Sequence, residues 1–454
     1  MKVDYIVAEI GSTTTVLSAF ITSGNGKLMF LAQGESYTTV NENDVTIGIE
    51  KAMNKLKERL EIKDLTWNTF LASSSAAGGL KITVHGLVYD MTVKAAREAA
   101  LGAGGVIQYV TAGKMREKNL EYINKYDPRL ILLAGGVDYG EIETVIHNAR
   151  LLSQLDLDVP IVYAGNIAAK DEISDIFKKS GEDVIITENV YPRIDQLNVE
   201  PTKKIIRNVF AKNIVKGPGM EKIYSTIDKD IIPTPASVML TTELLAENMD
   251  DVMVVDIGGA TTDVDSYTRG DPEIQNMLIA PEPLAKRTVE GDLGVFINAS
   301  RVANYIGVDQ LEHDFFDLEK HLKDISPYPK NSEQEQFVSR LARYCFETSI
   351  RRHAGKIRHL FGPLGRVEVA EGKDLTAIKQ VIGTGGVLTR SKYKREIMKN
   401  VEVLSRKYPD ELLPRTDVKK GVDKNYIFAA IGVLSTVDRQ AAEDVLSDSI
   451  ETIG

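Results

Sequence analysis

Two distant segments of the chain carry the same combination of a carboxylate, glycine and hydroxyl residues. The first, E-I-G-S-T-T-T, runs from Glu9 to Thr15, and the second, D-I-G-G-A-T-T, runs from Asp256 to Thr262. In each, an apolar run ends in the acid, turns at glycine and resumes as a second extended run, which predicts two β-hairpins. Backbone N–H groups and hydroxyls around such a turn can hold phosphate oxygens. We therefore expect two phosphate-binding hairpins that face each other.

The acids before the two turns imply a bound cation. A carboxylate at this position would repel a phosphate group unless a divalent cation lay between them. Glu9 and Asp256 are therefore candidate metal-binding and catalytic residues, and two such loops imply a nucleotide clamp. The remaining candidate phosphate-binding residues of the two turns are Gly11, Ser12, Thr13, Thr14, Gly258, Gly259, Thr261 and Thr262.

A third glycine-rich turn lies near the C-terminus. The segment V-I-G-T-G-G-V-L-T, from Val381 to Thr389, follows an extended run and opens a helical one. Backbone donors at a helix start can hold the phosphates or the ribose edge of a nucleotide. The candidate binding residues here are Gly383, Thr384, Gly385 and Gly386. The sequence has no P-loop, no Rossmann glycine fingerprint, no H-E-x-x-H and no paired C-x-x-C, which removes several other nucleotide and metal sites.

Composition limits the class of protein. A chain of 454 residues is too long for one hydrophobic core, so two to four domains are expected. No stretch approaches the roughly 18 consecutive apolar residues of a membrane-spanning helix, and the N-terminus lacks a signal-peptide pattern, so we expect a cytoplasmic protein without a membrane partner. The formal charge of −10 disfavours a nucleic-acid partner. The single cysteine, Cys345, lies in a helical pattern where a small apolar core role fits.

The order of apolar patterns outlines the elements that hold the turns. Residues 3–34 predict three strands, and residues 44–60 predict a helix. From residue 129 to 177, two apolar strands each precede a helical pattern, which predicts βα units of a parallel sheet. The glycine turns after these strands could bind a ligand, but we favour a scaffold role. Residues 425–446 predict a helix whose small residues, such as Gly432, permit a close helix crossing.

In their order along the chain, the three turns resemble the phosphate-1, phosphate-2 and adenosine motifs of the superfamily that contains acetate and sugar kinases, Hsp70 chaperones and actin. The resemblance implies an α/β, actin/Hsp70-like ATPase with two ribonuclease-H-like lobes and an inserted parallel βα segment. ATP and Mg²⁺ would lie in the cleft between the lobes. We place the first lobe at residues 1–125, completed by a C-terminal helix at 425–454. The insertion and a helical linker would occupy 126–248, and the second lobe 249–424.

The second hairpin favours hydrolysis over phosphoryl transfer. V-V-D-I-G-G-A-T-T-D-V-D looks like the Hsp70 and actin form, in which the nucleophile is water. In that template Asp256 organises Mg²⁺ through its water shell and Asp263 helps to orient the attacking water. The alternative for Asp263 and Asp265 is outward-facing polarity of an alternating strand. Glu9 departs from the superfamily, which usually has Asp here, and its longer arm shifts where a Mg²⁺-bound water can sit.

The whole chain resembles the MutL family of accessory proteins to coenzyme-B12-dependent mutases, which includes the glutamate mutase accessory protein and is unrelated to the mismatch-repair protein of that name. Matching segments include L-A-G-G-V-D-Y-G, E-N-V-Y-P-R-I-D, K-R-T-V-E-G-D-L-G and V-I-G-T-G-G-V-L-T-R-S. The resemblance implies a reactivating chaperone. ATP hydrolysis and cleft closure would release damaged cobalamin from a mutase or aminomutase, so that intact adenosylcobalamin can rebind.

Several alternatives stay open. The same lobes could form a small-molecule kinase or an actin-like ATPase scaffold. The chain lacks D-x-H-x-x-G, the cobalamin signature of many mutases, so it should not be the mutase itself. Its six histidines have no metal-ligand spacing and predict surface or satisfied-core positions. Glutamate, ornithine and lysine mutases are all candidate partners, and the chain could act as a homodimer or with a small second subunit.

Overall fold

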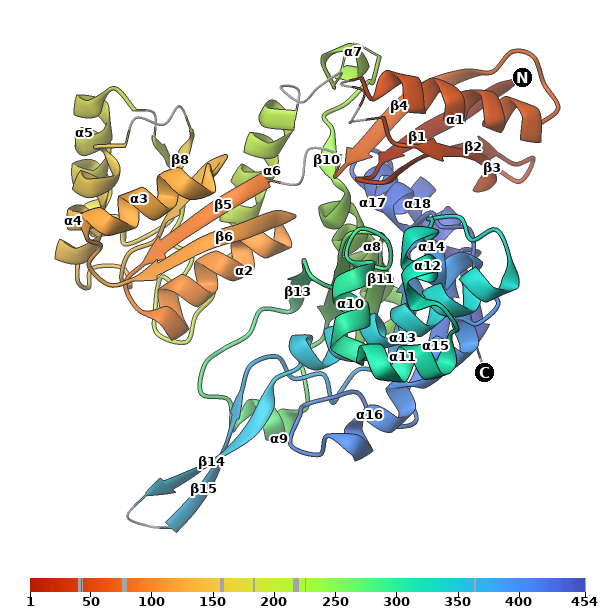
Figure 1. Cartoon of the computed structure of the whole chain (residues 1–454). Coiled ribbons are helices and arrows are strands. Elements are labelled where there is room, and N and C mark those ends of the chain that lie inside the picture. Colours follow the sequence, from red (N-terminus) through yellow and green to blue (C-terminus); the bar gives the residue numbers. More distant parts are fainter. Residues whose placement is uncertain are drawn as a thin grey trace. The chain divides into compact units, whose positions relative to one another are not determined.

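The computed structural model divides the chain into two compact units (Figure 1). It describes residues 1–39, 42, 44–75, 80–155, 159–182, 184–214, 220–224, 226–362 and 365–453. Unit 1 contains Met1–Ala76, Pro218–Ile279 and Leu284–Gly454, and unit 2 contains Ala77–Gly217 and Ala280–Pro283. All three predicted turns therefore belong to unit 1.

The first sheet of unit 1 places the N-terminal hairpin at its centre. It has the order β10-β4-β1-β2-β3. The strands are β1 (Lys2–Ile10), β2 (Thr14–Thr22), β3 (Leu28–Tyr37), β4 (Thr66–Ser74) and β10 (Ile232–Pro233). Strand β1 is antiparallel to β2 and parallel to β4. Helix α1 (Thr46–Arg59) packs on β2 and β3 through Ala52 and Leu56, which are fully buried.

The second sheet of unit 1 repeats this arrangement. Its order is β13-β12-β11-β16-β17-β18. The strands are β11 (Val252–Ile257), β12 (Thr262–Tyr267), β13 (Ala285–Glu290), β16 (Gln380–Thr384), β17 (Lys419–Asp423) and β18 (Ile450–Ile453). Strand β11 is antiparallel to β12 and parallel to β16, as β1 is to β2 and β4. Two sheets with a central hairpin joined to parallel strands are the two ribonuclease-H-like lobes of the predicted fold, and the fold class is confirmed.

Helices cover both sheets, and one small ribbon projects from unit 1 (Figure 1). The ribbon is the antiparallel pair β14 (Lys356–Gly362) and β15 (Gly365–Glu371). The helices between β10 and β14 are α8 (Thr234–Met249), α9 (Pro272–Gln275), α10 (Ala299–Ile306), α11 (Val308–Asp314), α12 (Leu318–Lys323) and α13 (Ser332–His353). The remaining helices of unit 1 are α7 (Met220–Tyr224), α14 (Gly386–Arg390), α15 (Lys394–Lys399), α16 (Val401–Lys407), α17 (Phe428–Ser435) and α18 (Arg439–Ser447).

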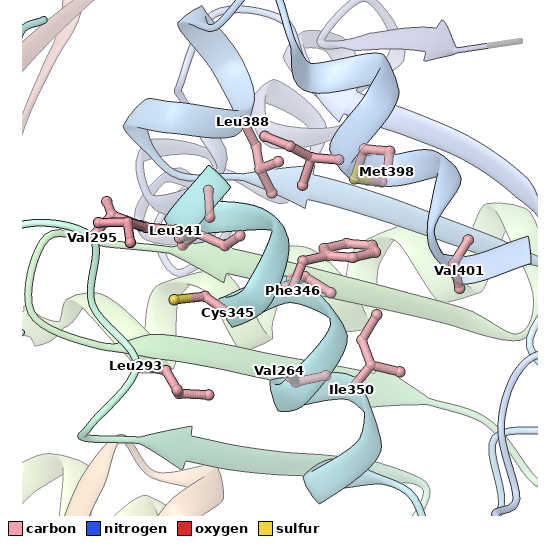
Figure 2. Packing of buried hydrophobic residues seen from close by; sticks show 14 of the residues in the cluster. Val264, Leu293, Val295, Leu341, Cys345, Phe346, Ile350, Leu388, Met398 and Val401 are labelled. Atoms are coloured by element: carbon pink, nitrogen blue, oxygen red, sulfur yellow. The ribbon is translucent and has the colours of Figure 1, made fainter. Parts of the chain in front are cut away.

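Helix α13 builds the core of the second lobe. Asn331 caps its start, accepting a hydrogen bond from the backbone N–H of Gln334 at 2.9 Å. Figure 2 shows Cys345 and Phe346 of this helix among the buried side chains of the cluster. Cys345 is fully buried, and this burial raises the pKa of its thiol to about 12. The predicted core role of Cys345 is confirmed.

The predicted C-terminal helix is two helices followed by a strand. Helix α17 packs against α8 and against β1 and β4, α18 packs on β3, and β18 pairs with β17 of the second sheet. A Cβ atom placed on Gly432 would lie 1.8 Å from the backbone oxygen of Ser237. Only glycine allows α17 and α8 to approach so closely, which confirms the predicted crossing at small residues.

Unit 2 is a parallel sheet with the order β6-β5-β7-β8-β9. The strands are β5 (Leu80–Gly86), β6 (Gly105–Ala112), β7 (Leu130–Leu133), β8 (Ile161–Tyr163) and β9 (Val184–Ile186). The helical segments are η2 (Tyr89–Val93), α2 (Lys94–Gly102), α3 (Glu117–Tyr126), α4 (Glu143–Leu152), η3 (Ile167–Ala169), α5 (Lys170–Ser180) and α6 (Glu200–Ile214). The two predicted βα units, β7–α4 and β8–α5, are present.

The insertion begins earlier in the chain than residue 126, where we predicted its start. Strands β5 and β6 pair with β7 and thus belong to unit 2, whereas α8 belongs to unit 1. No composition change marks this boundary, because β5 follows β4 with only a short connection. A Cβ on Gly165 would lie 2.3 Å from the backbone nitrogen of Gly135, which agrees with a packing role for these glycine turns. No helix in the described ranges has the length and apolar character of a membrane span.

Candidate functional site

The two acid-bearing hairpins have matching turns that face each other. The N–H of Gly11 donates to the oxygen of Thr14 at 2.9 Å, and the N–H of Gly258 donates to the oxygen of Thr261 at the same distance. A Cβ on Gly259 would lie 3.2 Å from the methyl group of Thr13, so the two turns are close neighbours. The prediction of two facing hairpins is confirmed.

A cavity of about 440 Å³ lies between these turns, inside unit 1. Many of the residues predicted from the sequence line it, and they are Glu9, Gly11, Ser12, Thr13, Thr14, Asp256, Gly258, Gly259, Thr261, Asp263 and Gly386. The structure thus brings residues of all three predicted turns to one cavity.

Other predicted residues lie outside the cavity wall and have packing roles. The hydroxyl of Thr262 donates to the backbone oxygen of Leu293 at 2.6 Å, on the core side of β12. A Cβ on Gly383 would lie 2.8 Å from Leu388, so this glycine makes room for α14. The hydroxyl of Thr384 donates to Asp423 at 2.9 Å.

Gly385 approaches the second hairpin through its backbone. Its φ is +91°, a value that residues with a side chain rarely adopt. A Cβ here would lie 2.3 Å from the backbone oxygen of Ile257 and 2.7 Å from Oδ1 of Asp256. The third glycine turn therefore packs directly on the acid end of β11, which only glycine permits.

The acids at this site repel one another. Burial raises the pKa of Asp256 well above its usual value, and the neighbouring carboxylates Asp263, Glu9, Asp265 and Asp423 raise it further. Burial also raises the pKa of Glu9 to about 7, although a hydrogen bond from Tyr426 opposes the shift. So many carboxylates around one cavity favour binding of a cation.

A loop that the sequence reasoning missed completes the acid cluster. Burial raises the pKa of Asp423 to about 6, and its Oδ2 accepts hydrogen bonds from the N–H groups of Ile427 and Phe428 at 2.8 and 2.9 Å. Three residues later, the Tyr426 hydroxyl donates to Glu9 at 3.0 Å. Tyr426 has a φ of 55°, an unusual conformation for a bulky residue. The available signal was weak, because the strand K-K-G-V-D ends in an acid, as the runs at Glu9 and Asp256 do, but begins with two lysines.

Aromatic, proline, valine and serine residues also line the cavity. These include Pro327, Tyr328, Pro329, Val338, Ser339 and Val387. Arg390 also lines the cavity, forms an ion pair with Glu35 and lies 5.3 Å from the centre of the Tyr426 ring. The Tyr328 hydroxyl donates to Glu35 at 3.4 Å. This mixture of flat apolar surfaces and polar edges suits a planar ring with hydrogen-bonding groups.

The donor set fits a hydrated divalent cation. Among the residues that the structure describes, no three His, Cys, Asp or Glu side chains form a group that could hold a metal directly. Glu9 and Asp256 nevertheless reach the same cavity from opposite hairpins. Two carboxylates that reach one cavity without a full set of protein ligands suit Mg²⁺, which keeps several of its waters when it binds to protein and phosphate.

The two most buried histidines are satisfied within the core. His85 lies between the hydroxyls of Thr83 and Thr111 at 3.0 and 2.8 Å, and burial lowers its pKa to about 3. His353 contacts the hydroxyls of Ser266 and Thr288, and burial lowers its pKa well below the usual value. Both positions match the predicted satisfied-core role.

Comparison with known proteins assigns the family. The model of a family described as "MutL protein" matches residues 5–450. The chain belongs to the MutL family. It is 39% identical to "Protein MutL" of Clostridium tetanomorphum, over 95% of this chain and 96% of that protein. The MutL family resemblance inferred from the sequence is thus confirmed along nearly the whole chain.

Solved structures align with this MutL family member only distantly. A diol dehydratase-reactivating factor in nucleotide-free form aligns over 95% of this chain and 99% of its own, at 12% identity and a TM-score of 0.37. A glycerol dehydratase reactivase covers the same shares at 9% identity and a TM-score of 0.35. The ethanolamine utilization protein EutJ of Carboxydothermus hydrogenoformans covers 94% of this chain and 88% of its own, at 11% identity and a TM-score of 0.29. The fold assignment rests on the strand order of the two sheets.

Proposed function

We propose that this chain is an ATPase that reactivates an adenosylcobalamin-dependent mutase or aminomutase. The observation that supports the proposal is the pair of facing hairpins, whose turns and acids converge on one cavity together with the third glycine turn. MutL family membership supports the accessory role. In this proposal unit 1 supplies the two lobes around the site, and unit 2 is the inserted segment.

Each part of the cavity has a place in this proposal. The N–H groups and hydroxyls of Ser12, Thr13 and Thr261 would bind phosphate oxygens from the two sides. Glu9 and Asp256 would hold the water shell of Mg²⁺, which would neutralise phosphate charge. Asp263 would orient the attacking water. The adenosine would lie against Tyr328 and Val387 of α14, because these residues offer apolar surface in the cavity wall.

The chemistry asks for positioning and charge compensation and needs no covalent intermediate on the protein. The cluster of acids suits this role only when a cation is present, since the neighbouring carboxylates raise the pKa of Asp256. Hydrolysis would change how the two lobes sit on the nucleotide and therefore the affinity for the partner. Moving a partner complex from 1:99 to 99:1 requires a difference of about 5.5 kcal/mol between nucleotide states.

A reactivation assay tests the proposal. Glutamate, ornithine and lysine mutases would each be inactivated with cyanocobalamin and incubated with this chain, adenosylcobalamin, Mg²⁺ and either ATP or a non-hydrolysable analogue. We expect ATP alone to restore the activity of at least one mutase, with release of ADP. Recovery that does not depend on ATP, or no recovery of any of the three enzymes, would contradict the proposal.

Two controls distinguish the alternatives. Asp309, an exposed acid on α11, offers a matched Asp309→Asn variant that should reactivate normally, while Asp256→Asn should not. ADP release that appears only with an added acid or sugar would instead indicate a small-molecule kinase. Sedimentation of large assemblies that depends on ATP would indicate an actin-like scaffold.

A further inference from the structure

Arg287 of β13 is a fully buried cation beside the site. Its side chain is 1% exposed, and its Nη2 lies 2.8 Å from Oδ1 of Asp263. On the other side, its Nε lies 3.6 Å from Oδ1 of Asp265, which is also 1% exposed. Arg287 is among the largest side chains that the described residues bury completely. Such burial is costly unless the charge is paired, so the two aspartates must offset the loss of water.

The strand register explains how one guanidinium reaches both acids. Arg287 is directly opposite Asp265 across the β12–β13 pair, and Asp263 lies two residues farther along the same face of β12. The residue between the two acids, Val264, points into the core of the second lobe. Asp263 and Asp265 are therefore held on the face of the sheet that carries Asp256, and the alternative of outward-facing strand polarity is wrong for both.

The contact with Arg287 determines the orientation of the Asp263 carboxylate. One oxygen, Oδ1, receives the guanidinium, and the other, Oδ2, accepts the hydroxyl of Thr261 at 3.2 Å. Thr261 belongs to the second turn and lines the cavity, as Asp263 does. Both carboxylate oxygens are thus fixed by neighbours, and the guanidinium offsets part of the repulsion between Asp263 and Asp256.

The first lobe shows that the fold does not require this arrangement. Strand β2 has Val16 at the position of Asp263 and Ser18 at the position of Asp265, by their register with the acid strand. Opposite Ser18, β3 has Gln33, which donates to the backbone oxygen of Asn425 at 3.1 Å. The same hairpin topology therefore forms with uncharged residues at the positions of Asp263, Asp265 and Arg287. The charged group in the second lobe calls for a functional explanation.

We propose that Arg287 is a positioning residue for hydrolysis, which holds the Asp263 carboxylate in the orientation that directs the attacking water. This inference rests on the proposed ATPase function and adds to it a residue that does not touch the nucleotide. Arg287 acts on the site through Asp263, and its contact with Asp265 offsets the burial of its charge. Its loss should therefore slow the chemical step and leave nucleotide affinity unchanged.

A double-mutant cycle tests this dependence. Arg287→Lys keeps the charge but loses the planar fork, and a misplaced carboxylate should lower turnover by roughly 10- to 100-fold. The KM for MgATP and the Kd for ADP should stay within about twofold. In an Asp263→Asn background, Arg287→Lys should cause no further loss, because the group through which it acts is already disabled. Losses that multiply, or a weaker Kd, would overturn the inference.

Matched variants separate positioning from stability. Lys286 is a buried cation on the same strand that donates to the backbone oxygen of Thr268 at 2.7 Å. Lys286→Arg should lower the melting temperature and leave turnover unchanged. If Arg287→Lys does not fold, Arg287→Gln combined with Asp265→Asn removes one charge of each sign and should give the same kinetic result. A wild-type chain without ATPase activity would contradict the proposed function, whereas an active wild type with multiplicative losses would contradict only the role of Arg287.

Discussion

The two hairpins share a fold and differ in their charged surroundings. In the first lobe, Glu9 is the acid that precedes the hairpin turn, and it accepts the hydroxyl of Tyr426 at 3.0 Å. In the second lobe, Asp256 is paired across the strand with Asp263, and Arg287 compensates the charge from the next strand. The same backbone therefore supports two tasks. We assign nucleotide positioning to both hairpins and the control of water to the second alone.

The largest effect should follow from removing the acid of the second hairpin. Asp256→Asn should lower ATP turnover by about two to three orders of magnitude, the scale seen when one preorganised electrostatic group is lost. Glu9→Gln should also lower ATP turnover, but its fold-loss should be about ten times smaller. The reason is that the first hairpin has no acid that acts on water. Steady-state ADP release with circular dichroism as a folding control measures both. Equal losses in the two variants would remove the proposed asymmetry.

The third glycine turn should be the next most sensitive position. Gly385→Ala forces a Cβ within 2.3 Å of the backbone oxygen of Ile257 and strains a φ of +91°. We expect weaker ADP binding, by about tenfold, and a lower melting temperature, since the acid end of β11 must shift. Gly24→Ala is the matched control, because its Cβ would meet nothing within 4 Å and Gly24 does not line the cavity. Isothermal titration calorimetry measures the Kd for ADP of both variants. Equal Kd values would contradict the prediction.

The raised pKa values predict a pH-dependent stability of the ligand-free chain. The pKa of Glu9 is raised to about 7 and that of Asp423 to about 6, so the folded state binds these protons more tightly than the unfolded chain does. Their contribution to stability is present below pH 4 and is lost as pH rises through 6 and 7. The melting temperature should fall between pH 5 and 8, and Mg²⁺ with ADP should reverse the loss at pH 8. If the melting temperature of Glu9→Gln no longer falls near pH 7, the loss of stability at that pH comes from Glu9 of the first hairpin.

The smallest effect should come from the hydroxyl that holds Glu9. Tyr426→Phe keeps the ring beside Arg390 and removes only the donor to the first acid. We expect turnover to fall about fivefold, in line with the loss of roughly 1 kcal/mol for one hydrogen bond. The half-saturating Mg²⁺ concentration should rise in parallel. If Tyr426→Phe has no effect in wild type yet changes the Glu9→Gln variant, the hydroxyl acts on another group.

Local patterns predicted the strands, the turns and the scaffold. Both hairpins, the third glycine turn and the two βα units could be inferred because each is specified by residues close together in sequence. The boundary of the insertion could not be inferred, because the apolar pattern of β5 and β6 would be the same in either sheet. Strand pairing depends on contacts between residues that are distant in sequence, and the sequence around Ala77 does not indicate which sheet β5 joins.

The sequence by itself determined which residues carry the acids, glycines and hydroxyls of the site, and the MutL family resemblance extended this along the chain. Only the tertiary structure decided that Asp423 and Tyr426 join the acid cluster, that Thr262 turns toward the core, and that Arg287 lies between two buried aspartates. The physical reason is that burial and charge pairing depend on strands that meet from opposite ends of the chain. Spacing along the sequence does not encode these distances.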